Sequence, residues 1–189
     1  MDIYLIRHTR PDIAPDVCYG RLDIGLPEGY ASEAARLPAL LPDVAATIVT
    51  SNAQRCRRLA DLLAAPHNSR VTIDDRLREL DFGDWEGRPW SDIPKIQTTV
   101  WAKDVWNQSA PGGESYSGMH ARVSAAWESL LLIADETLVV VGHAGPLRAL
   151  LTIALELPAE SFIRFHLDYG GIARLSDAPG GWRLDFANR

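Results

Sequence analysis

The sequence predicts an α/β fold in which helices cover both faces of a mostly parallel central sheet. Strand-like and helix-like segments alternate along most of the 189 residues, as in a three-layer α/β/α architecture. Two apolar runs, residues 3–6 and 138–141, lack polar alternation, which is typical of strands buried on both faces of a parallel sheet. Three short strand candidates, broken by glycine pairs, fill residues 162–186 and predict an antiparallel edge.

The first half of the chain supplies strands and helices in turn. We expect strands at 3–6, 47–50 and 71–73, and helices at 31–41 and 53–65. Pro42 and Pro66 indicate where the two helices end, because the residue before a proline disfavours helical geometry. Ser51 can cap the second helix. Residues 9–29 are rich in glycine and proline, and a loop of this length inside a compact domain usually has a function.

The second half contains an irregular segment, which precedes the remaining helices and the most apolar strand. From residue 76 to 113 no hydrophobic period holds, and four of the six tryptophans gather there. We expect residues 80–116 to form a small irregular insertion over the active site, within a single domain that spans 1–189. The remaining helices are expected at 117–133 and 146–155.

Composition restricts the partners of the protein. Acidic residues outnumber basic ones by 25 to 19, and the basic residues are dispersed, which argues against nucleic acid as a partner. A small anionic substrate remains possible, because a few local arginines can outweigh the global sign of the charge. The apolar stretches are too short to span a bilayer, so no membrane partner is expected. Oligomeric state is not readable from the sequence.

Cysteine usage indicates the compartment. Cys18 and Cys56 have neither C-x-x-C spacing nor the number needed for a disulfide framework. The apolar run that begins at residue 3 leaves no room for a signal peptide, so we expect none. These observations predict a cytoplasmic protein.

Two histidines and two arginines are predicted to meet at one edge of the sheet. Arg7-His8 and Gly142-His143 directly follow the two buried strands, and ligands bind at the carboxyl ends of the strands in open α/β sheets. Arg55 lies one turn into the helix after a third strand, and the amino end of that helix favours an anion. Arginine offers a rigid fork of donors, and histidine titrates near neutral pH. The constellation therefore predicts a phosphate site.

Four motifs in the same order resemble those of one enzyme family. They are Arg7-His8, Ser51-x-x-x-Arg55, Leu77-Arg78-Glu79-x-x-Phe82-Gly83-x-Trp85-Glu86-Gly87 and Gly142-His143-Ala144-Gly145. With these motifs the chain resembles the histidine phosphatase superfamily, in its phosphoglycerate-mutase-like branch, over nearly its whole length. The resemblance implies a phosphomonoesterase of α/β fold whose partner is a small phosphorylated metabolite.

The resemblance and the residue types together imply a covalent mechanism. His8 is the expected nucleophile, because a neutral imidazole can attack phosphorus and form a phosphohistidine. The groups expected to hold the phosphoryl oxygens and stabilise their charge are Arg7, Arg55 and His143. Glu79 is the expected proton donor and activator of water, and Glu86 is its rival.

No metal and no cofactor are expected. The five histidines lack the spacings H-E-x-x-H and H-x-H, and the acidic residues form no recognisable ligand set. The sequence departs from the family pattern at Thr9, which replaces a glycine, and at Ala14, which replaces an asparagine that contacts phosphate. We therefore expect Thr9 or Arg10 to complete the phosphate pocket, with Tyr19 and Ala144 as further substrate-binding residues.

Three segments resemble the α-ribazole phosphatase group more closely than other members. They are Arg7-His8-Thr9-x-Pro11-Asp12, Cys18-Tyr19-Gly20-Arg21-Leu22-Asp23 and residues 77–86. The resemblance implies removal of the 5′-phosphate of α-ribazole 5′-phosphate, or of its cobalamin-attached form, in vitamin B12 nucleotide-loop assembly. A flat apolar base suits a pocket with aromatic walls. Candidate walls, at least half of which we expect to be core residues instead, are Tyr19, Trp85, Trp90, Trp101 and Trp106.

Other functions stay open at this point. The nearest is a broad phosphatase of sugar phosphates or nucleotides, and a phosphoglycerate mutase is less favoured because the chain offers no long covering segment. A different class is a non-catalytic relative that binds phosphorylated ligands, against which the joint presence of His8 and Glu79 argues. A metal-dependent hydrolase is the last alternative, which activity in EDTA would exclude.

Overall fold

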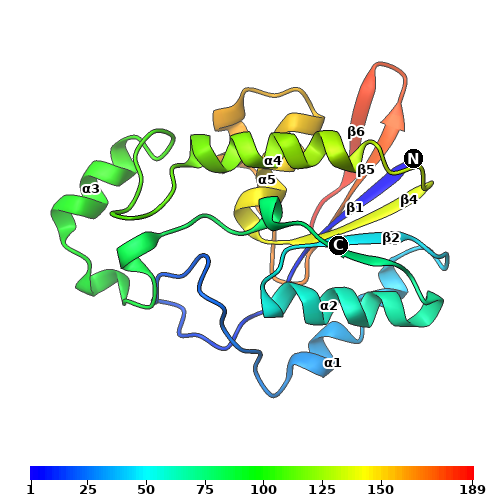
Figure 1. Cartoon of the computed structure of the whole chain (residues 1–189), viewed down its shortest axis with the longest axis horizontal. Coiled ribbons are helices and arrows are strands. Elements are labelled where there is room, and N and C mark those ends of the chain that lie inside the picture. The colour runs from blue at the N-terminus through cyan, green and yellow to red at the C-terminus, as the bar shows by residue number, and fades with distance from the viewer.

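The computed structural model describes all residues, 1–189, and contains one six-stranded sheet in the order β3-β2-β4-β1-β5-β6 (Figure 1). The strands are β1 (Asp2–Arg7), β2 (Thr47–Thr50), β3 (Val71–Ile73), β4 (Thr137–Gly142), β5 (Ile172–Ala178) and β6 (Gly181–Phe186). Strands β1 to β4 are parallel, whereas β5 runs antiparallel to β1 and β6 antiparallel to β5. The predicted mostly parallel sheet with an antiparallel edge is confirmed.

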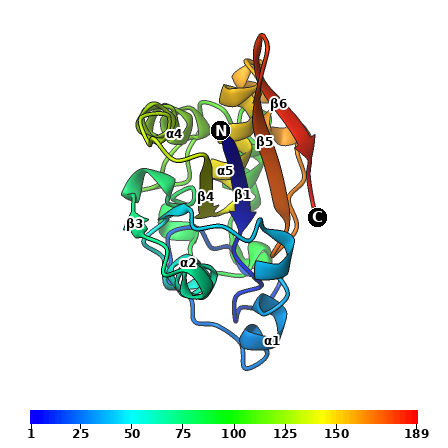
Figure 2. The ribbon, with the colours of Figure 1, turned by 90° about the vertical axis from the view of Figure 1, so that its right-hand side faces the viewer.

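Helices cover both faces of this sheet, so the predicted three layers are also confirmed (Figure 2). One face carries α1 (Tyr30–Ala34) and α2 (Gln54–Ala64), and the other carries α4 (Tyr116–Leu130) and α5 (Ala144–Ala154). Side chains of β1 alternate between the layers, because successive residues of a strand point to opposite faces. Ile3 and Leu5 pack on the side of α4 and α5, and Tyr4 and Ile6 pack on the side of α2.

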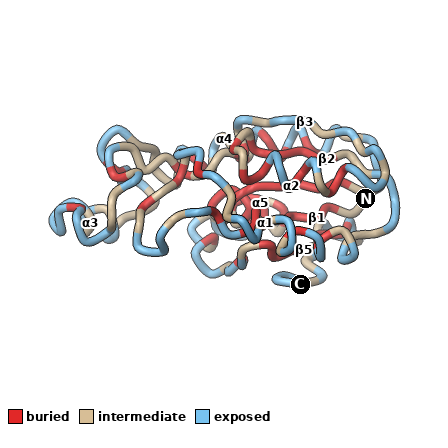
Figure 3. Tube along the Cα trace, turned by 90° about the horizontal axis from the view of Figure 1, so that it is seen from below, coloured by how far each residue is buried: buried red, intermediate tan, exposed pale blue.

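Burial is concentrated in the strands and the helix faces turned toward them, whereas the outer loops are exposed (Figure 3). Such a core fixes the carboxyl ends of β1, β2 and β4 relative to one another. The positions of the residues that directly follow these strands are therefore fixed relative to one another. None of the helices is long and apolar enough to cross a membrane.

The cap segment, residues 80–116, extends beyond the carboxyl edge of the sheet (Figure 1). It has an aromatic centre of its own, in which ring centroids lie 5.8 to 6.3 Å apart. The rings are those of Phe82, Trp85, Trp90 and Trp101. Trp85 is fully buried and donates from its indole nitrogen to the Gln97 side chain at 2.9 Å. Three of the four tryptophans of this region thus stabilise the cap segment rather than line a site at the sheet.

The cap segment also contains a helix that the sequence does not predict, α3 (Lys95–Lys103). No residue of α3 is buried, so the apolar period that normally identifies a helix is missing. Ile96, Thr98, Thr99 and Val100 are β-branched, which lowers helix propensity further. The expectation of an irregular segment from 76 to 113 is wrong over these nine residues.

Two other expected elements differ from the prediction. The helix expected at 31–41 is α1 followed by a separate 3-10 turn at Pro38–Leu40, because Pro38 has no N–H to donate to the carbonyl four residues earlier. The third strand candidate of the tail is absent. Ala159–Arg164 forms a 3-10 helix after Pro158 instead, and only β5 and β6 are strands.

Candidate active site

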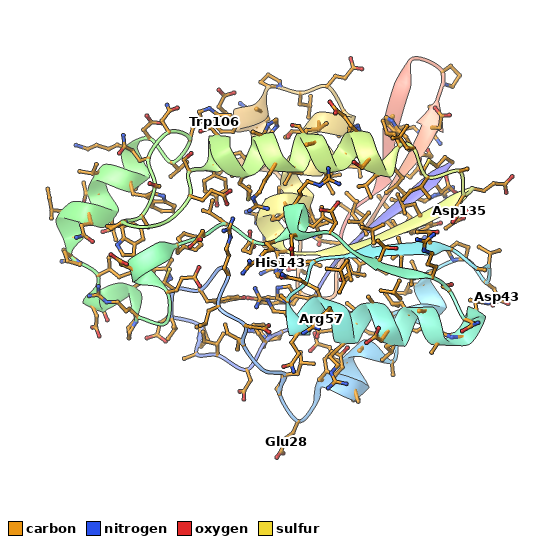
Figure 4. The ribbon with its side chains drawn as sticks, viewed as in Figure 1. Glu28, Asp43, Arg57, Trp106, Asp135 and His143 are labelled. Carbon is orange, nitrogen blue, oxygen red and sulfur yellow. The ribbon has the colours of Figure 1, made fainter.

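The two histidines predicted to meet do so, at the carboxyl ends of neighbouring strands. Strands β1 and β4 pair in parallel with Arg7 opposite Gly142, so His8 and His143 each follow directly at the same edge. Their ring centroids lie 5.1 Å apart in an edge-to-face arrangement, and both residues are only 1% exposed. Figure 4 shows His143 in the middle of the molecule, where the sheet meets the cap segment.

His8 is held in one tautomer by its neighbour. Its Nδ1 lies 2.7 Å from the carbonyl oxygen of Thr9, and because a carbonyl only accepts, Nδ1 carries the proton and Nε2 the lone pair. Burial and then the positive charges of Arg55 and Arg7 lower the pKa of His8 well below its usual value, against the opposing effect of the Thr9 carbonyl. His8 is therefore a neutral imidazole at neutral pH.

His143 adopts the opposite tautomer. Its Nδ1 accepts from a terminal guanidinium nitrogen of Arg55 at 3.3 Å, and its Nε2 donates to the hydroxyl of Ser51 at 2.9 Å. The pKa of His143 is also well below its usual range, chiefly through burial and then through electrostatic coupling to the His8 ring and to the Arg55 guanidinium. The Cys56 sulfur lies 3.5 Å from Nε2, but burial raises the pKa of this thiol. Cys56 thus packs beside the site in its neutral form.

Arg55 is fully buried in the first turn of α2. Its terminal nitrogens donate to the carbonyls of Gly20 and Leu22, at 2.7 and 2.8 Å, while its buried Nε has no hydrogen-bond partner. The guanidinium thereby links the loop 9–29 to His143. Its cationic charge is not paired with any carboxylate.

The amino end of α2 is capped differently from the sequence-based expectation. The residue before the helix is Ala53, and the amide of Gln54 donates to the carboxylate of Asp23 at 2.7 Å. Ser51 is not the cap, because its hydroxyl interacts with His143. A carboxylate of the protein itself therefore accepts one of the amides at this helix end.

Arg7 lies against a tyrosine that sequence reasoning missed. Its Cζ is 3.7 Å from the ring centroid of Tyr169, which is within the range of cation–π contacts, and its Nη1 donates to the Leu167 carbonyl at 2.6 Å. The Tyr169 ring also lies 5.6 Å from that of His8. Gly170 holds the tyrosine there by donating its amide to the carbonyls of Arg7 and His8.

A signal in the sequence could have identified Tyr169. An antiparallel strand begins at the edge where its parallel neighbours end, so the residues before β5 necessarily lie beside those after β1. The glycine pair at 170–171 marks this beginning. Applying that geometry to the predicted antiparallel edge places Tyr169 at the site.

Four further residues were expected to bind substrate. Tyr19 lies at the site, with its ring 5.5 Å from the Arg55 Cζ and its hydroxyl 2.5 Å from that of Tyr169. Thr9 is fully buried and its hydroxyl has no hydrogen-bond partner. Arg10 is exposed and lies 5.2 Å from the Tyr169 ring, whereas Ala144 starts α5 directly after His143.

Glu79 lies at the amino end of α5. Its carboxylate accepts from the amides of Leu80, at 2.9 Å, and Gly145, at 3.3 Å. Only a glycine allows this approach, because a Cβ at position 145 would lie 2.3 Å from Glu79 Oε1. The Glu79 carboxylate thus accepts from a backbone amide only two residues beyond His143, at the same edge of the sheet.

Glu86, the rival acid, is occupied elsewhere. Its two oxygens accept from the backbone amides of Arg21, Leu22 and Phe82, at 2.5 to 3.0 Å. This carboxylate joins the loop 9–29 to the cap segment. The structure also contains no group of three or more His, Cys, Asp or Glu side chains that could hold a metal ion. Trp106, the remaining aromatic candidate, lies against His120 and Phe162, near the start of α4 (Figure 4).

Comparisons with known proteins show which family and fold this chain shares. The adenosylcobalamin/alpha-ribazole phosphatase of Escherichia coli is 29% identical over 177 residues, which cover 90% of this chain and 87% of the relative. A probable phosphoglycerate mutase of Erwinia tasmaniensis is 28% identical over 190 residues, which cover 96% of this chain and 87% of the relative. The crystal structure of the alpha-ribazole phosphatase from Shigella flexneri superposes with a TM-score of 0.91 at 26% identity, covering 100% of this chain and 96% of that one.

The family profile that matches is the histidine phosphatase superfamily (branch 1), over residues 3–189. The match includes every element that contributes to the site: the ends of β1 and β4, the start of α2, the Glu79 segment and the start of α5. The chain therefore belongs to branch 1 of the histidine phosphatase superfamily and is a phosphomonoester hydrolase.

Proposed function

We propose that this protein hydrolyses phosphate monoesters without a metal ion, through a phosphohistidine formed on Nε2 of His8. The observation that carries the proposal is the 2.7 Å hydrogen bond from His8 Nδ1 to the Thr9 carbonyl. It leaves the lone pair on Nε2, and the lowered pKa keeps the ring unprotonated. A buried, neutral and oriented imidazole is what nucleophilic attack on phosphorus requires.

Arg7, Arg55 and His143 are the groups proposed to hold the transferring phosphoryl group. The two guanidiniums supply positive charge inside a buried site, where charge stabilisation is stronger than in water. Neither arginine is paired with a carboxylate, and each has a buried Nε without a partner. Both therefore retain donors for phosphoryl oxygens, and a reoriented His143 can add one more.

Glu79 is proposed as the proton donor and Glu86 as a structural residue. The oxygens of Glu86 already accept three backbone hydrogen bonds, whereas Glu79 lies beside the amino end of the helix that follows His143. Proton transfer to a departing alkoxide typically contributes about 10²- to 10⁴-fold to the rate.

The proposed reaction has two steps, transfer of the phosphoryl group to His8 and then to water. In the first, the Nε2 lone pair of His8 forms the N–P bond, the P–O bond to the alcohol breaks, and Glu79 gives its proton to the departing oxygen. In the second, the Glu79 carboxylate takes a proton from water while the water oxygen bonds to phosphorus. The N–P bond then breaks and its electron pair returns to His8, which leaves inorganic phosphate and the starting enzyme.

The physiological ester that we propose is α-ribazole 5′-phosphate, free or attached to cobalamin. Three segments of the sequence resemble that group of phosphatases, and two of the relatives described above carry its name. The second candidate is a broad phosphatase of sugar phosphates or nucleotides. A mutase activity is favoured only by the names of relatives such as the one from Erwinia tasmaniensis.

The test measures kcat/KM for α-ribazole 5′-phosphate, ribose 5-phosphate, AMP and p-nitrophenyl phosphate, all in EDTA, with release of inorganic phosphate as the readout. A strong preference for α-ribazole 5′-phosphate would support the proposed substrate. Similar, slow rates on every ester would support the broad phosphatase. Binding of phosphate without any turnover would overturn the catalytic proposal in favour of a phospho-ligand-binding protein, and loss of activity in EDTA would overturn metal independence.

A further inference from the structure

Arg122 of α4 uses all five N–H groups of its guanidinium in hydrogen bonds within the protein. Nε and Nη2 donate to the two carboxylate oxygens of Glu114, both at 2.8 Å. Nη1 donates to the carbonyls of Arg76 and Arg78, at 2.6 and 2.7 Å, and Nη2 donates also to the carbonyl of Glu79, at 3.0 Å. An arginine side chain has five N–H donors in total. All five of them bond to two segments of the chain, Glu114 and residues 76–79.

The anchor of this arrangement is rigid. Helix α4 is packed into the core through Met119, Val123 and Ala126, which are at most 1% exposed. The side chains of Arg122 and Glu114 are each only 17% exposed. A bidentate arginine–carboxylate pair with little access to water is among the stronger and more directional contacts in proteins. Arg21 adds a second cation, because it pairs with both Glu114 and Asp81.

The segment that Arg122 holds contains neither a strand nor an α-helix. One 3-10 turn, Asp75–Leu77, precedes Glu79, and Leu77 and the adjoining Leu80 are buried in the core. Arg122 fixes the backbone of Glu79 from the side of α4, while the amide of Gly145 fixes its carboxylate from the side of α5. The acid thus has its main chain and its side chain attached to two different helices.

We propose that Arg122, clamped by Glu114, is a positioning residue that holds Glu79 where it can protonate the departing oxygen. This inference rests on the proposed role of Glu79. A general acid acts only within hydrogen-bond reach of the oxygen that it protonates, and a displacement of about 1 Å can cost roughly 100-fold in rate. A lysine at position 122 would keep the positive charge but has three donors on one nitrogen, so it cannot make all five contacts.

The experiment compares kcat/KM for two esters that differ in their need for an acid. p-Nitrophenyl phosphate has a good leaving group and needs little protonation, whereas ribose 5-phosphate releases a poor alkoxide. We expect Arg122→Lys to lose roughly tenfold or more beyond its loss on the aryl ester when it acts on ribose 5-phosphate. Glu114→Gln, which weakens the clamp without touching Arg122, is expected to shift the ratio in the same direction. This second variant keeps the test decisive if Arg122→Lys does not fold.

The matched control is Arg76→Gln. Arg76 also links this segment to α4, through a 2.8 Å hydrogen bond from Nη1 to the Ala125 carbonyl, but its side chain does not contact Glu79. We expect equal, small losses on both esters for this control. Equal losses on both esters for Arg122→Lys and Glu114→Gln would overturn the inference while Glu79→Gln still discriminates between the esters. If Glu79→Gln itself fails to discriminate, the assignment of the proton donor is wrong instead.

Discussion

The hydroxyl oxygens of Tyr19 and Tyr169 lie 2.5 Å apart, although 150 residues separate them in the chain. Each ring also lies against one arginine of the site, since the Arg55 Cζ is 5.5 Å from the ring centroid of Tyr19 and the Arg7 Cζ is 3.7 Å from that of Tyr169. The tyrosine pair therefore connects the loop 9–29 to the start of β5 across the two guanidiniums. Burial, and then the hydrogen bond with Tyr169, raises the pKa of the Tyr19 phenol.

This pairing predicts a specific pattern of stabilities. Tyr19→Phe and Tyr169→Phe should each lower the free energy of unfolding by about 1–3 kcal/mol, because each leaves one phenol without its partner. The double variant should lose no more than either single variant, since removing both hydroxyls leaves no unsatisfied group. Urea denaturation of all four proteins measures the cycle, and simple additivity of the two losses would contradict the pairing.

Replacing the proposed nucleophile should abolish the reaction. We expect His8→Ala to have no turnover and to give no covalent phosphoenzyme when it is mixed with radiolabelled aryl phosphate and quenched. The matched control is His166→Ala, because His166 is exposed and interacts only with Asp168 and the Asn188 side chain. Wild-type activity in His8→Ala would contradict the mechanism.

The loss of activity caused by replacing Glu79 should depend on the leaving group of the ester. Glu79→Gln should lose about 100-fold or more in kcat/KM on an alkyl phosphate but much less on p-nitrophenyl phosphate, because only the alkoxide needs a proton. Glu86→Gln is the control: it should lower thermal stability, by weakening hydrogen bonds to Arg21, Leu22 and Phe82, and should keep the ratio between the two esters. The reverse pattern would make Glu86 the acid.

Removal of the Arg55 guanidinium should weaken phosphate binding. A charge-assisted hydrogen bond contributes about 1.5–3 kcal/mol, so kcat/KM should fall roughly tenfold or more in Arg55→Ala, and the inhibition constant of inorganic phosphate should rise. Arg57→Ala is the matched control, because Arg57 is two residues further along α2 and exposed (Figure 4). No change in either constant would remove Arg55 from the site.

The lowered pKa values of His8 and His143 make two predictions about pH. Because the folded state resists protonation of both rings, stability should decrease as pH falls below about 6.5, where unfolded histidines begin to bind protons. The slope should approach about 1.4 kcal/mol per pH unit for each ring until the folded-state pKa values are passed. Denaturation between pH 7 and 4, compared with His8→Ala, measures the share of one ring.

The pH dependence of kcat/KM should also reflect the lowered pKa of His8. The acid limb of kcat/KM that reports protonation of His8 should lie well below pH 6.5, after correction for ionisation of the substrate phosphate, whose second pKa is about 6. A limb at or above pH 6.5 would mean that His8 is not the neutral nucleophile of the free enzyme.

The sequence alone was sufficient for the sheet and for the histidine pair. Unbroken apolar runs identify β1 and β4 because both faces of these strands are covered, and a residue that follows such a strand can lie only at its carboxyl end. The same local logic failed for α3, whose exposed, β-branched residues carry no period, and for the helix expected at 31–41, which Pro38 interrupts.

The motif order also singled out Glu79, but it left Glu86 as a rival. Only the fold separates the two carboxylates, since Glu86 accepts amides of Arg21 and Leu22, which are distant in sequence. Likewise Ser51 has the residue type of a helix cap, yet the amide of Gln54 donates to the carboxylate of Asp23, and the hydroxyl of Ser51 interacts with His143. The hydrogen-bond partners of these side chains are distant in sequence, so no local pattern predicts them.

By itself, then, the sequence determined the layers, the parallel core and the edge of the sheet at which the two histidines meet, because the hydrophobic pattern that indicates a buried strand is a local property of the chain. The tertiary structure alone decided the tautomers of the two histidines, the tyrosine pair and the five hydrogen bonds of Arg122. Each of these depends on groups that lie far apart in sequence and meet within hydrogen-bond distance, where a difference of less than 1 Å decides whether a contact exists.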